Sequence, residues 1–331
     1  MPGMNGTEPK IEIFKPFGEA FELTKKILFQ PFDLTKWLVT GFAAFLSGHF
    51  GGVGINFPYP FGNFQPHRAD QIIRPHFGQW QPWLQITVAF FAVLVFGLII
   101  VIMWLKARGN FIFTDCIVRN RAAIVEPWRE YRKEGNSYFL FFLALILAVL
   151  VLAAIMLAIF VAIGWVGHHA REMSSTVFIG FLLFLFVFWI SIGIFIAVVS
   201  YFMLPVMYRR RCRALEAFRD VTQLIARNPG SFVLFCLFRI VLILAVVMIG
   251  TIVSCATCCT AALPYIGTVI LLPLFVCLRS FVLLFVRQCG PNYDVWANYT
   301  PPEFLPVLSS GPPVPPPSTS LNPPSSPPAS T

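Results

Sequence analysis

The chain has 331 residues, of which 57% are hydrophobic and only 12% are charged, and its formal net charge is +9 at pH 7. This balance excludes an ordinary soluble domain, in which about a quarter of the residues are charged. The sequence contains no nucleotide-binding glycine loop, Ser-His-Asp arrangement, HExxH motif or pair of intramembrane carboxylates. We therefore expect a membrane protein, and the sequence offers no catalytic residue and no cofactor.

The chain begins with a polar leader over residues 1–36, which carries five acidic residues. This leader is too long and too acidic for the n-region of a cleaved signal peptide, so we expect it to be retained. Within it, Phe17, Phe21, Thr24 and Leu28 share one helical face opposite charged residues. That spacing predicts an amphipathic helix that lies in the membrane interface on the cytoplasmic side.

Six stretches are apolar enough, and long enough, to cross a bilayer as helices, which takes about 20 residues. They are expected at about residues 37–55, 83–105, 138–166, 176–208, 231–254 and 265–286. These unbroken runs lack the alternation of barrel strands, and only helices or closed barrels satisfy the backbone in lipid. The predicted fold is an all-α polytopic membrane protein with six transmembrane helices in a domain over residues 37–287. Pro273 predicts a kink in the last helix because it removes a backbone donor.

The chain uses one unit three times: a short amphipathic helix, a breaker and two spans. The tripeptides Glu19-Ala20-Phe21 and Glu216-Ala217-Phe218 coincide in the first and third units, ahead of Pro31 and Pro229. The middle unit, over residues 117–135, matches in position more than in sequence. We thus expect an interfacial helix before each odd-numbered span.

In the third unit, the apolar face of the amphipathic helix is formed by Leu215, Phe218, Thr222 and Ile225. Basic and acidic residues lie opposite this face, as in a helix that rests on a membrane surface. We expect this apolar face to contact lipid and no other part of the protein.

The basic residues fall in alternate gaps between the spans. Of the 24 Lys and Arg, 19 lie at the two ends or in the second and fourth gaps, three lie in the other gaps and two lie within spans. By the positive-inside rule, both termini face the cytoplasm. The segment over residues 49–81 is rich in Gly, Pro and aromatic residues, and we expect it to form an irregular external lid.

Residues 288–331 form a tail that is rich in Pro and Ser. Such a composition cannot bury a core, so the sequence predicts a disordered cytoplasmic tail with stretches of polyproline II. A proline-binding domain is one conceivable ligand, but a solvated tail is the simpler interpretation.

The third unit leads from Glu216-Ala217-Phe218 through Ala226-Arg227-Asn228-Pro229-Gly230 into a span. This arrangement resembles the polytopic membrane domain attached to some bacterial glycerophosphodiester phosphodiesterases, and related stand-alone bacterial membrane proteins, over roughly residues 12–290. The catalytic barrel of those phosphodiesterases is absent, so no catalytic residue is carried over. The resemblance implies a membrane module, and an association with lipids.

Two arginines lie inside spans, and no span contains an acidic partner. Arg239 lies eight residues into the fifth span, and Arg279 lies about as far from the cytoplasmic end of the sixth. At 1.5 Å per residue, both would lie at matching depth, roughly 12 Å from the boundary. They could hold one phosphate or carboxylate together. Alternatively, each could extend alone to the cytoplasmic headgroups, which is the simpler interpretation.

All five His, and the group Cys255, Cys258 and Cys259, map to the external side. Metal binding, an external disulfide and plain packing are all compatible with the Cys group, but the His lack metal-ligand spacing, so no metal site is predicted. The basic loops indicate topology and attraction to anionic lipid headgroups, and no nucleic-acid partner is expected.

The leading hypothesis is a non-enzymatic integral membrane protein that interacts with membrane lipids or a membrane partner. The main alternative is a transporter or flippase-like carrier of an anionic amphiphile, and a weaker one is a membrane-embedded enzyme of lipid metabolism. The hypothesis of an anion site requires the guanidinium groups of Arg239 and Arg279 to converge on one enclosed polar cavity.

Overall fold

The computed structural model describes residues 12, 14–49, 82–170, 175–257 and 263–297. Within these residues the regular structure is helical, which confirms the all-α prediction. The elements are α1 (Phe14–Phe29), α2 (Leu34–Leu46), α4 (Pro82–Val118), α5 (Val125–Glu130), α6 (Arg132–Ala170), α7 (Ser175–Arg210), α8 (Ala214–Arg227), α9 (Pro229–Ala256), α10 (Pro264–Ile270), α11 (Leu272–Arg287) and a short 3-10 turn, η3 (Pro291–Tyr293).

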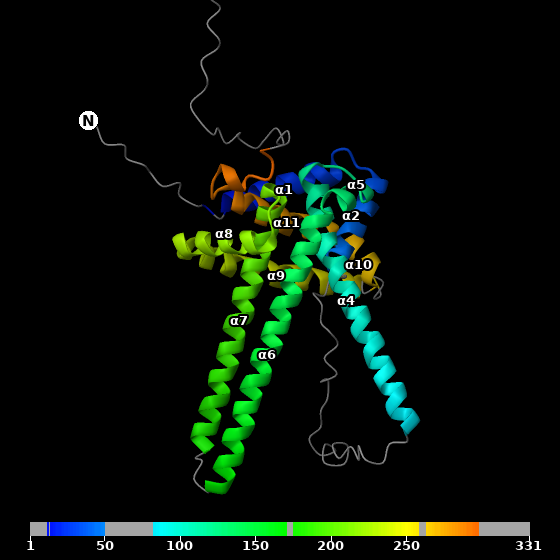
Figure 1. The fold of residues 1–331 in the computed structure, drawn as a ribbon. Helices are drawn as coiled ribbons and strands as arrows, with labels where there is room; N and C mark the ends of the chain where they lie inside the picture. The colour runs from blue at the N-terminus through cyan, green and yellow to red at the C-terminus, as the bar shows by residue number, and fades with distance from the viewer. Residues whose placement is uncertain (1–11, 13, 50–81, 171–174, 258–262, 298–331) are drawn as a thin grey trace, which may run out of the picture.

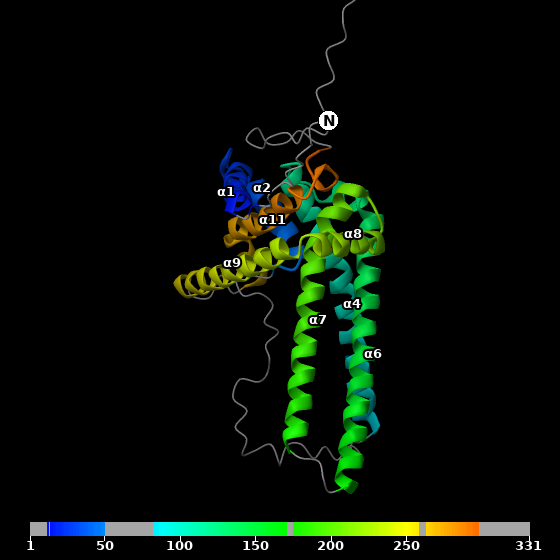
Figure 2. The same cartoon turned by 90° about the vertical axis from the view of Figure 1, so that its left-hand side faces the viewer.

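The molecule has a head from which three long helices extend. Figure 1 shows α1, α2, α5, α8, α10 and α11 gathered at one end, with α4, α6 and α7 running away from them. At its far end α4 splays away from α6 and α7. Figure 2 shows α9 running crosswise to α6 and α7, beneath the head.

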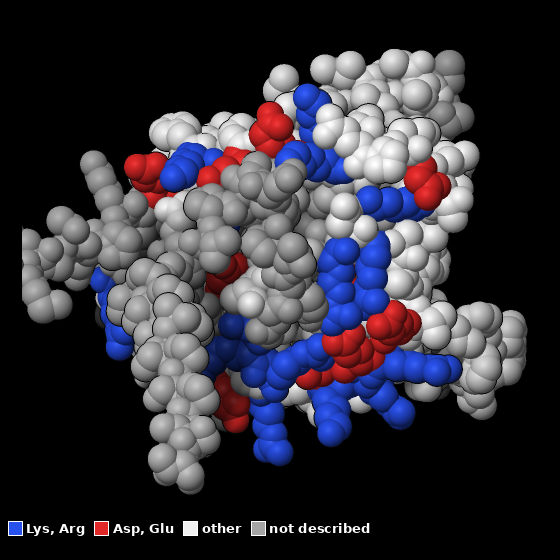
Figure 3. Space-filling view, turned by 90° about the horizontal axis from the view of Figure 1, so that it is seen from above, with Lys and Arg blue, Asp and Glu red and all other residues white. Residues whose placement is uncertain are grey.

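Four helices are long and apolar enough to cross a membrane, which supports the membrane-protein prediction. They are Trp83–Val118, Arg132–Ile159, Leu182–Arg210 and Pro229–Ala256. These helices cover most of the second to fifth predicted spans, and their outward residues are apolar, as lipid-facing positions require. The ends of α4, α6 and α7 that meet the head carry Lys and Arg. Figure 3 shows Lys and Arg together with Asp and Glu on the face of the head seen from above.

The sixth predicted span is not one continuous helix. The range 265–286 is divided at Leu271 into α10 and α11, and Pro273 lies in the first turn of α11, where a missing backbone N–H is tolerated. Residues 281–287 of α11 are all buried. The prediction of a span here is therefore not confirmed: neither α10 nor α11 is among the candidate membrane helices, and the apolar run of α11 fills the core of the head.

The first predicted span is represented by α2, an apolar helix of 13 residues that is too short to cross a bilayer. Residues 50–55 of that span, and the lid expected up to residue 81, lie outside the described residues. Asp33 caps α2, because its Oδ1 accepts a hydrogen bond of 2.8 Å from the backbone N–H of Thr35.

Close packing fixes α2 between α4 and α10. A Cβ on Gly109 of α4 would lie 2.5 Å from the backbone carbon of Leu46, and one on Gly41 would lie 2.9 Å from Cγ2 of Val269. Small residues permit such close approach between helices. The indole Nε1 of Trp37 also donates a hydrogen bond of 3.0 Å to the carbonyl of Val269. These contacts hold the C-terminal end of α2 against α4.

The first amphipathic helix is present as α1, but it packs on α11. Its buried face is formed by Ala20, Leu23, Thr24, Ile27 and Leu28, whereas Phe21 is exposed. The predicted face therefore includes Thr24 and Leu28 correctly. The expectation that the helix rests on lipid alone is wrong, because α11 supplies a protein surface for its apolar side.

The third amphipathic helix, α8, packs on α7 and also contacts α6 and α9. Its buried residues are Ala214, Ala217, Val221 and Leu224, one step around the helix from the predicted face. Leu215, on the predicted face, is exposed. The apolar side of α8 is thus wider than predicted: one stripe is buried in protein, and Phe218 and Ile225 of the neighbouring stripe are partly buried against the core.

The predicted tail begins later than residue 288. Residues 288–297 fold back onto the head, where Val295 and Trp296 are buried. The Nε of Arg287 lies 3.0 Å from the Oδ2 of Asp294, and the Oδ1 of Asp294 accepts a hydrogen bond from the backbone N–H of Trp296. This buried ion pair and the indole side chain fix the turn. Residues 298–331 lie outside the described residues.

The middle unit has a single short helix, α5, with Pro127 near its start. It does not form an amphipathic helix like α1 and α8, because α4 continues to Val118 and α6 begins at Arg132. The proposal of three equivalent units therefore stays a prediction.

Candidate functional site

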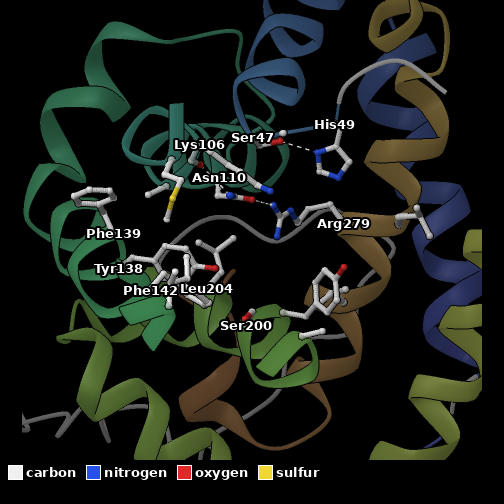
Figure 4. Close-up of a pocket in the computed structure, with 18 of the residues that line it drawn as sticks. Ser47, His49, Lys106, Asn110, Tyr138, Phe139, Phe142, Ser200, Leu204 and Arg279 are labelled. Atoms are coloured by element: carbon white, nitrogen blue, oxygen red, sulfur yellow. Dashed lines mark hydrogen bonds between the residues drawn. The ribbon is translucent and has the colours of Figure 1, made fainter. Parts of the chain in front are cut away.

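Arg239 of α9 and Arg279 of α11 line one cavity, which we call the basic cavity. Its volume is about 520 Å³, and it lies where α4, α6, α7, α9 and α11 meet the end of α2. Figure 4 draws most of the residues that line it. The full lining is formed by Ser47, Gly48, His49, Met103, Lys106, Ala107, Asn110, Tyr138, Phe139, Phe142, Ile146, Ala197, Ser200, Tyr201, Leu204, Arg239, Leu278, Arg279 and Val282.

Arg279 is buried, with 8% of the residue exposed. Its Nη2 donates a hydrogen bond to the Oδ1 of Asn110 on α4, drawn as a dashed line in Figure 4. Its guanidinium carbon also lies 5.7 Å from the ring centroid of Phe113, within the range of a cation–π contact. One amide oxygen cannot satisfy the five N–H donors of a guanidinium group.

Arg239 reaches the same cavity from α9. Its guanidinium carbon lies 3.7 Å from the ring centroid of Tyr201 on α7, so the aromatic face supports the charge. Its Nε and Nη1 atoms are buried and have no hydrogen-bond partner within the described part of the chain. A buried donor without a partner costs about 1–3 kcal/mol, so these N–H groups favour an acceptor in the cavity.

Lys106 adds a third cation to the lining. It lies one helical turn before Asn110 on α4, and this spacing places both residues on one helical face. The stem of Lys106 passes close to Gly48, where a Cβ would lie only 2.6 Å from its Cε. Gly48 also has a φ of +92°, a conformation that glycine adopts without strain.

Ser47 and His49 bring further polar atoms to the cavity. The Nδ1 of His49 and the Oγ of Ser47 share a hydrogen bond of 2.7 Å, and Ser47 Oγ also donates to the carbonyl of Ala44. His49 follows α2, outside the four candidate membrane helices. Burial, and then the charges of Arg279, Arg239 and Lys106, lower the pKa of His49 to about 3. The imidazole is therefore neutral near pH 7.

The opposite side of the cavity is mostly apolar, and Tyr138 and Ser200 bring two hydroxyl groups to it. Figure 4 shows Phe139 and Phe142 of α6 and Leu204 of α7 across from Lys106 and Arg279. The lining of α6 runs from Tyr138 to Ile146. Because α6 begins at Arg132, this lining lies about 9–21 Å from the charged end of the helix. The cavity thus has a cationic side and a mostly apolar side near the charged end of α6.

None of the described residues that line the cavity is Asp or Glu. Three cations in an apolar surrounding, without a carboxylate among them, have a large uncompensated desolvation cost. Arginine and lysine side chains are the usual partners of phosphate and carboxylate groups. The arrangement is that of a site for an anionic group that is attached to an apolar body.

The sequence identified Arg239 and Arg279, and the structure brings them together. The sequence analysis did not identify their neighbours in the cavity, which are Lys106, Asn110, Ser47, His49 and Tyr201. The spacing of four residues between Lys106 and Asn110 was a usable signal, because it places both on one face of a helix otherwise rich in apolar residues. The other residues come from separate helices, and the sequence carries no sign of their proximity.

Of the Cys and His residues that the sequence predicts on the external side, His49 instead lies in the basic cavity, and the others form no metal site in the part of the chain that the structure describes. No group of three His, Cys, Asp or Glu there could hold a metal ion, and Cys255 is a free thiol. Cys258 and Cys259 lie outside the described residues, so a disulfide in this group is not tested.

The fold and the cavity define an all-helical membrane protein with an internal basic site. The chain belongs to a family of unknown function, DUF7544, whose model matches residues 12–290. No curated protein and no solved structure matches the chain. The resemblance to the membrane domain of glycerophosphodiester phosphodiesterases extends over the same residues and stays a prediction.

Proposed function

We propose that the protein is a non-enzymatic integral membrane protein that binds the anionic headgroup of a membrane lipid in the basic cavity. The observation that carries this proposal is the convergence of Arg239 and Arg279 on one cavity that Lys106 also lines. The unsatisfied N–H donors of Arg239 support it, because an anionic acceptor would satisfy them. The aromatic and aliphatic side of the cavity would accept the apolar part of the lipid.

The orientation that we propose places the head in the cytoplasm of a bacterial cell and the long helices in the cytoplasmic membrane. The positive-inside rule supports this orientation, because Lys and Arg are concentrated where α4, α6 and α7 meet the head. The cavity lies toward that same end. This position favours binding from the cytoplasmic leaflet over carriage of a lipid across the membrane, which would need access from both sides.

A membrane-embedded enzyme is the second candidate, because Ser47 and His49 form a hydrogen-bonded pair in the cavity. A serine nucleophile needs a neighbouring base that takes its proton. Here the hydroxyl of Ser47 donates to the carbonyl of Ala44 at the end of α2, and the lowered pKa of His49 makes it a weak base. Both observations favour a structural role for the pair.

Lipid binding can be measured on the purified full chain by native mass spectrometry with phosphatidylglycerol, phosphatidate and neutral phosphatidylcholine. Arg239→Gln and Arg279→Gln should each reduce the occupancy of the anionic lipids by roughly tenfold, the value of one charged hydrogen bond. The double variant should add little, because the two arginines act on the same anion. Lys at either position should restore binding only in part, because it lacks the planar fork.

Arg227→Gln is the matched control, because Arg227 is exposed at the end of α8 and does not line the cavity. It should leave lipid occupancy unchanged. Unchanged occupancy in both single cavity variants would overturn the proposal. If the wild type releases a cleaved lipid and Ser47→Ala does not, the lipid-binding proposal would be replaced by that of a membrane-embedded enzyme.

A further inference from the structure

The charges and donors of the basic cavity determine which anionic group fits it, on the condition that the proposed function holds. The charged and titratable side chains that face the cavity are those of His49, Lys106, Tyr138, Tyr201, Arg239 and Arg279. Three of them are cations, and the described lining provides no carboxylate to balance them. The ligand itself must therefore supply the balancing negative charge.

A phosphodiester headgroup supplies one negative charge and two terminal oxygens. A phosphomonoester supplies up to two charges near pH 7 and three terminal oxygens that accept strong hydrogen bonds. The cavity offers three separate cationic donors, from α4, α9 and α11. Each terminal oxygen of a monoester can thus meet one of them, whereas a diester leaves one cation without an acceptor.

The arginine N–H donors are also arranged so that some of them remain available to the oxygens of a ligand. The Nη2 of Arg279 is engaged with Asn110, which fixes the direction of the guanidinium group. The Nε and Nη1 of Arg239 have no partner in the described residues, while Tyr201 holds the group from its face. Both arginines are oriented by neutral groups, and their charges remain available to a ligand.

The remaining volume decides what the phosphate is attached to. A cavity of about 520 Å³ is much larger than one phosphate group, and its far side is formed by Phe139, Phe142 and Leu204. We infer that the basic cavity selects a phosphomonoester over a phosphodiester, with the single ester bond leading to an apolar body. A lipid that ends in a monoester phosphate and a free phosphate ester share this chemistry, and the apolar side favours the lipid.

The test compares phosphatidate with phosphatidylglycerol of the same acyl chains, on the full chain in nanodiscs of phosphatidylcholine, by native mass spectrometry or a binding titration. At pH 8, phosphatidate should bind about tenfold more tightly, since it makes one further charged hydrogen bond. At pH 5 the preference should shrink, because the monoester phosphate loses its second charge with a pKa of about 6. The same decrease in preference between pH 8 and pH 5 should be seen in His49→Gln if the pH dependence comes from the ligand and not from the imidazole.

Lys106→Gln is the diagnostic variant, because it should reduce the preference for phosphatidate more than it reduces the binding of phosphatidylglycerol. Inorganic phosphate at millimolar concentration should compete weakly; competition as strong as that of phosphatidate would support the same chemistry with a free ester as its source. Equal affinities for the two lipids at pH 8 would overturn the inference and leave the proposed function intact. Binding of both lipids that ignores Arg239→Gln and Arg279→Gln would overturn the proposed function itself.

Discussion

Arginines cluster in two regions of this protein, and the two regions differ in whether carboxylates balance the arginine charges. In the first, which we call the paired cluster, Arg119, Arg121 and Arg211 surround Asp115 and Glu130 at the joint of α4, α5, α6 and α7. Arg119 lies 3.0 Å from Asp115 and 2.7 Å from Glu130, and Arg211 contacts Glu130. In the basic cavity, neutral groups alone contact the two arginines.

The difference separates structural charges from functional ones. In the paired cluster each cation meets a carboxylate in the folded chain, so the charges hold helices together. Asp115 is fully buried and also accepts a hydrogen bond of 2.9 Å from the hydroxyl of Tyr208 on α7. In the basic cavity the balancing charge is missing from the described lining. The proposed ligand would supply that charge, whereas the paired cluster balances its charges within the folded chain.

The largest effect should come from Asp115→Asn, which removes the central charge of the paired cluster and keeps the shape of the side chain. Breaking a buried ion pair from one side costs about 3–5 kcal/mol, because the remaining charges stay buried without a partner. Thermal unfolding in detergent, followed by intrinsic fluorescence, should show a large drop in the unfolding temperature. Size-exclusion chromatography should show less folded protein.

The same substitution at Asp220 is the control, since Asp220 pairs with Arg210 at a partly exposed position. Exposed pairs contribute about 0–1 kcal/mol, so Asp220→Asn should change little. Equal effects of the two substitutions would contradict the structural role of the paired cluster.

A smaller effect, with a defined pH dependence, is expected for Glu130→Gln. Although burial opposes the shift, the hydrogen bonds and charges of Arg119 and Arg211 lower the pKa of Glu130 below its ordinary value of 4.5. A lowered pKa in the folded state means that ionised Glu130 stabilises the fold above pH 4.5. This contribution is lost as the pH falls through the lower, folded-state pKa.

Glu130→Gln should therefore destabilise the protein by about 1 kcal/mol at pH 7 and by progressively less as the pH falls below 4.5. Unfolding temperatures of the two proteins across this pH range provide the measurement. Glu22→Gln, at an exposed position on α1, should show no such trend. A constant difference between wild type and Glu130→Gln at all pH values would contradict the assignment.

The smallest effect on stability is expected for Arg239→Gln. The loss of the cation–π contact with Tyr201 is offset by removal of an unbalanced charge, so the free energy of unfolding without lipid should change by less than about 1 kcal/mol. Addition of anionic lipid should raise the unfolding temperature of the wild type more than that of the variant. A drop as large as that of Asp115→Asn would place Arg239 among the structural charges.

The sequence by itself determined the helical, membrane character of the protein. Long apolar runs without charge have no stable alternative in lipid, and the four candidate membrane helices follow from that constraint. It also singled out Arg239 and Arg279, because an arginine in an apolar run is costly and calls for a reason. These conclusions need only the amino-acid composition of each helix taken by itself, and no knowledge of how the helices pack together.

Only the tertiary structure decided which apolar run is core and which charges are paired. The run that forms α11 reads as a membrane span, yet it is buried by α1, α2 and α7, because hydrophobicity alone does not distinguish lipid from a protein interior. Trp296 is likewise buried at the edge of a predicted tail. The basic cavity collects side chains from five helices and the end of α2. Charge compensation there depends on distances in space that no spacing along the chain encodes.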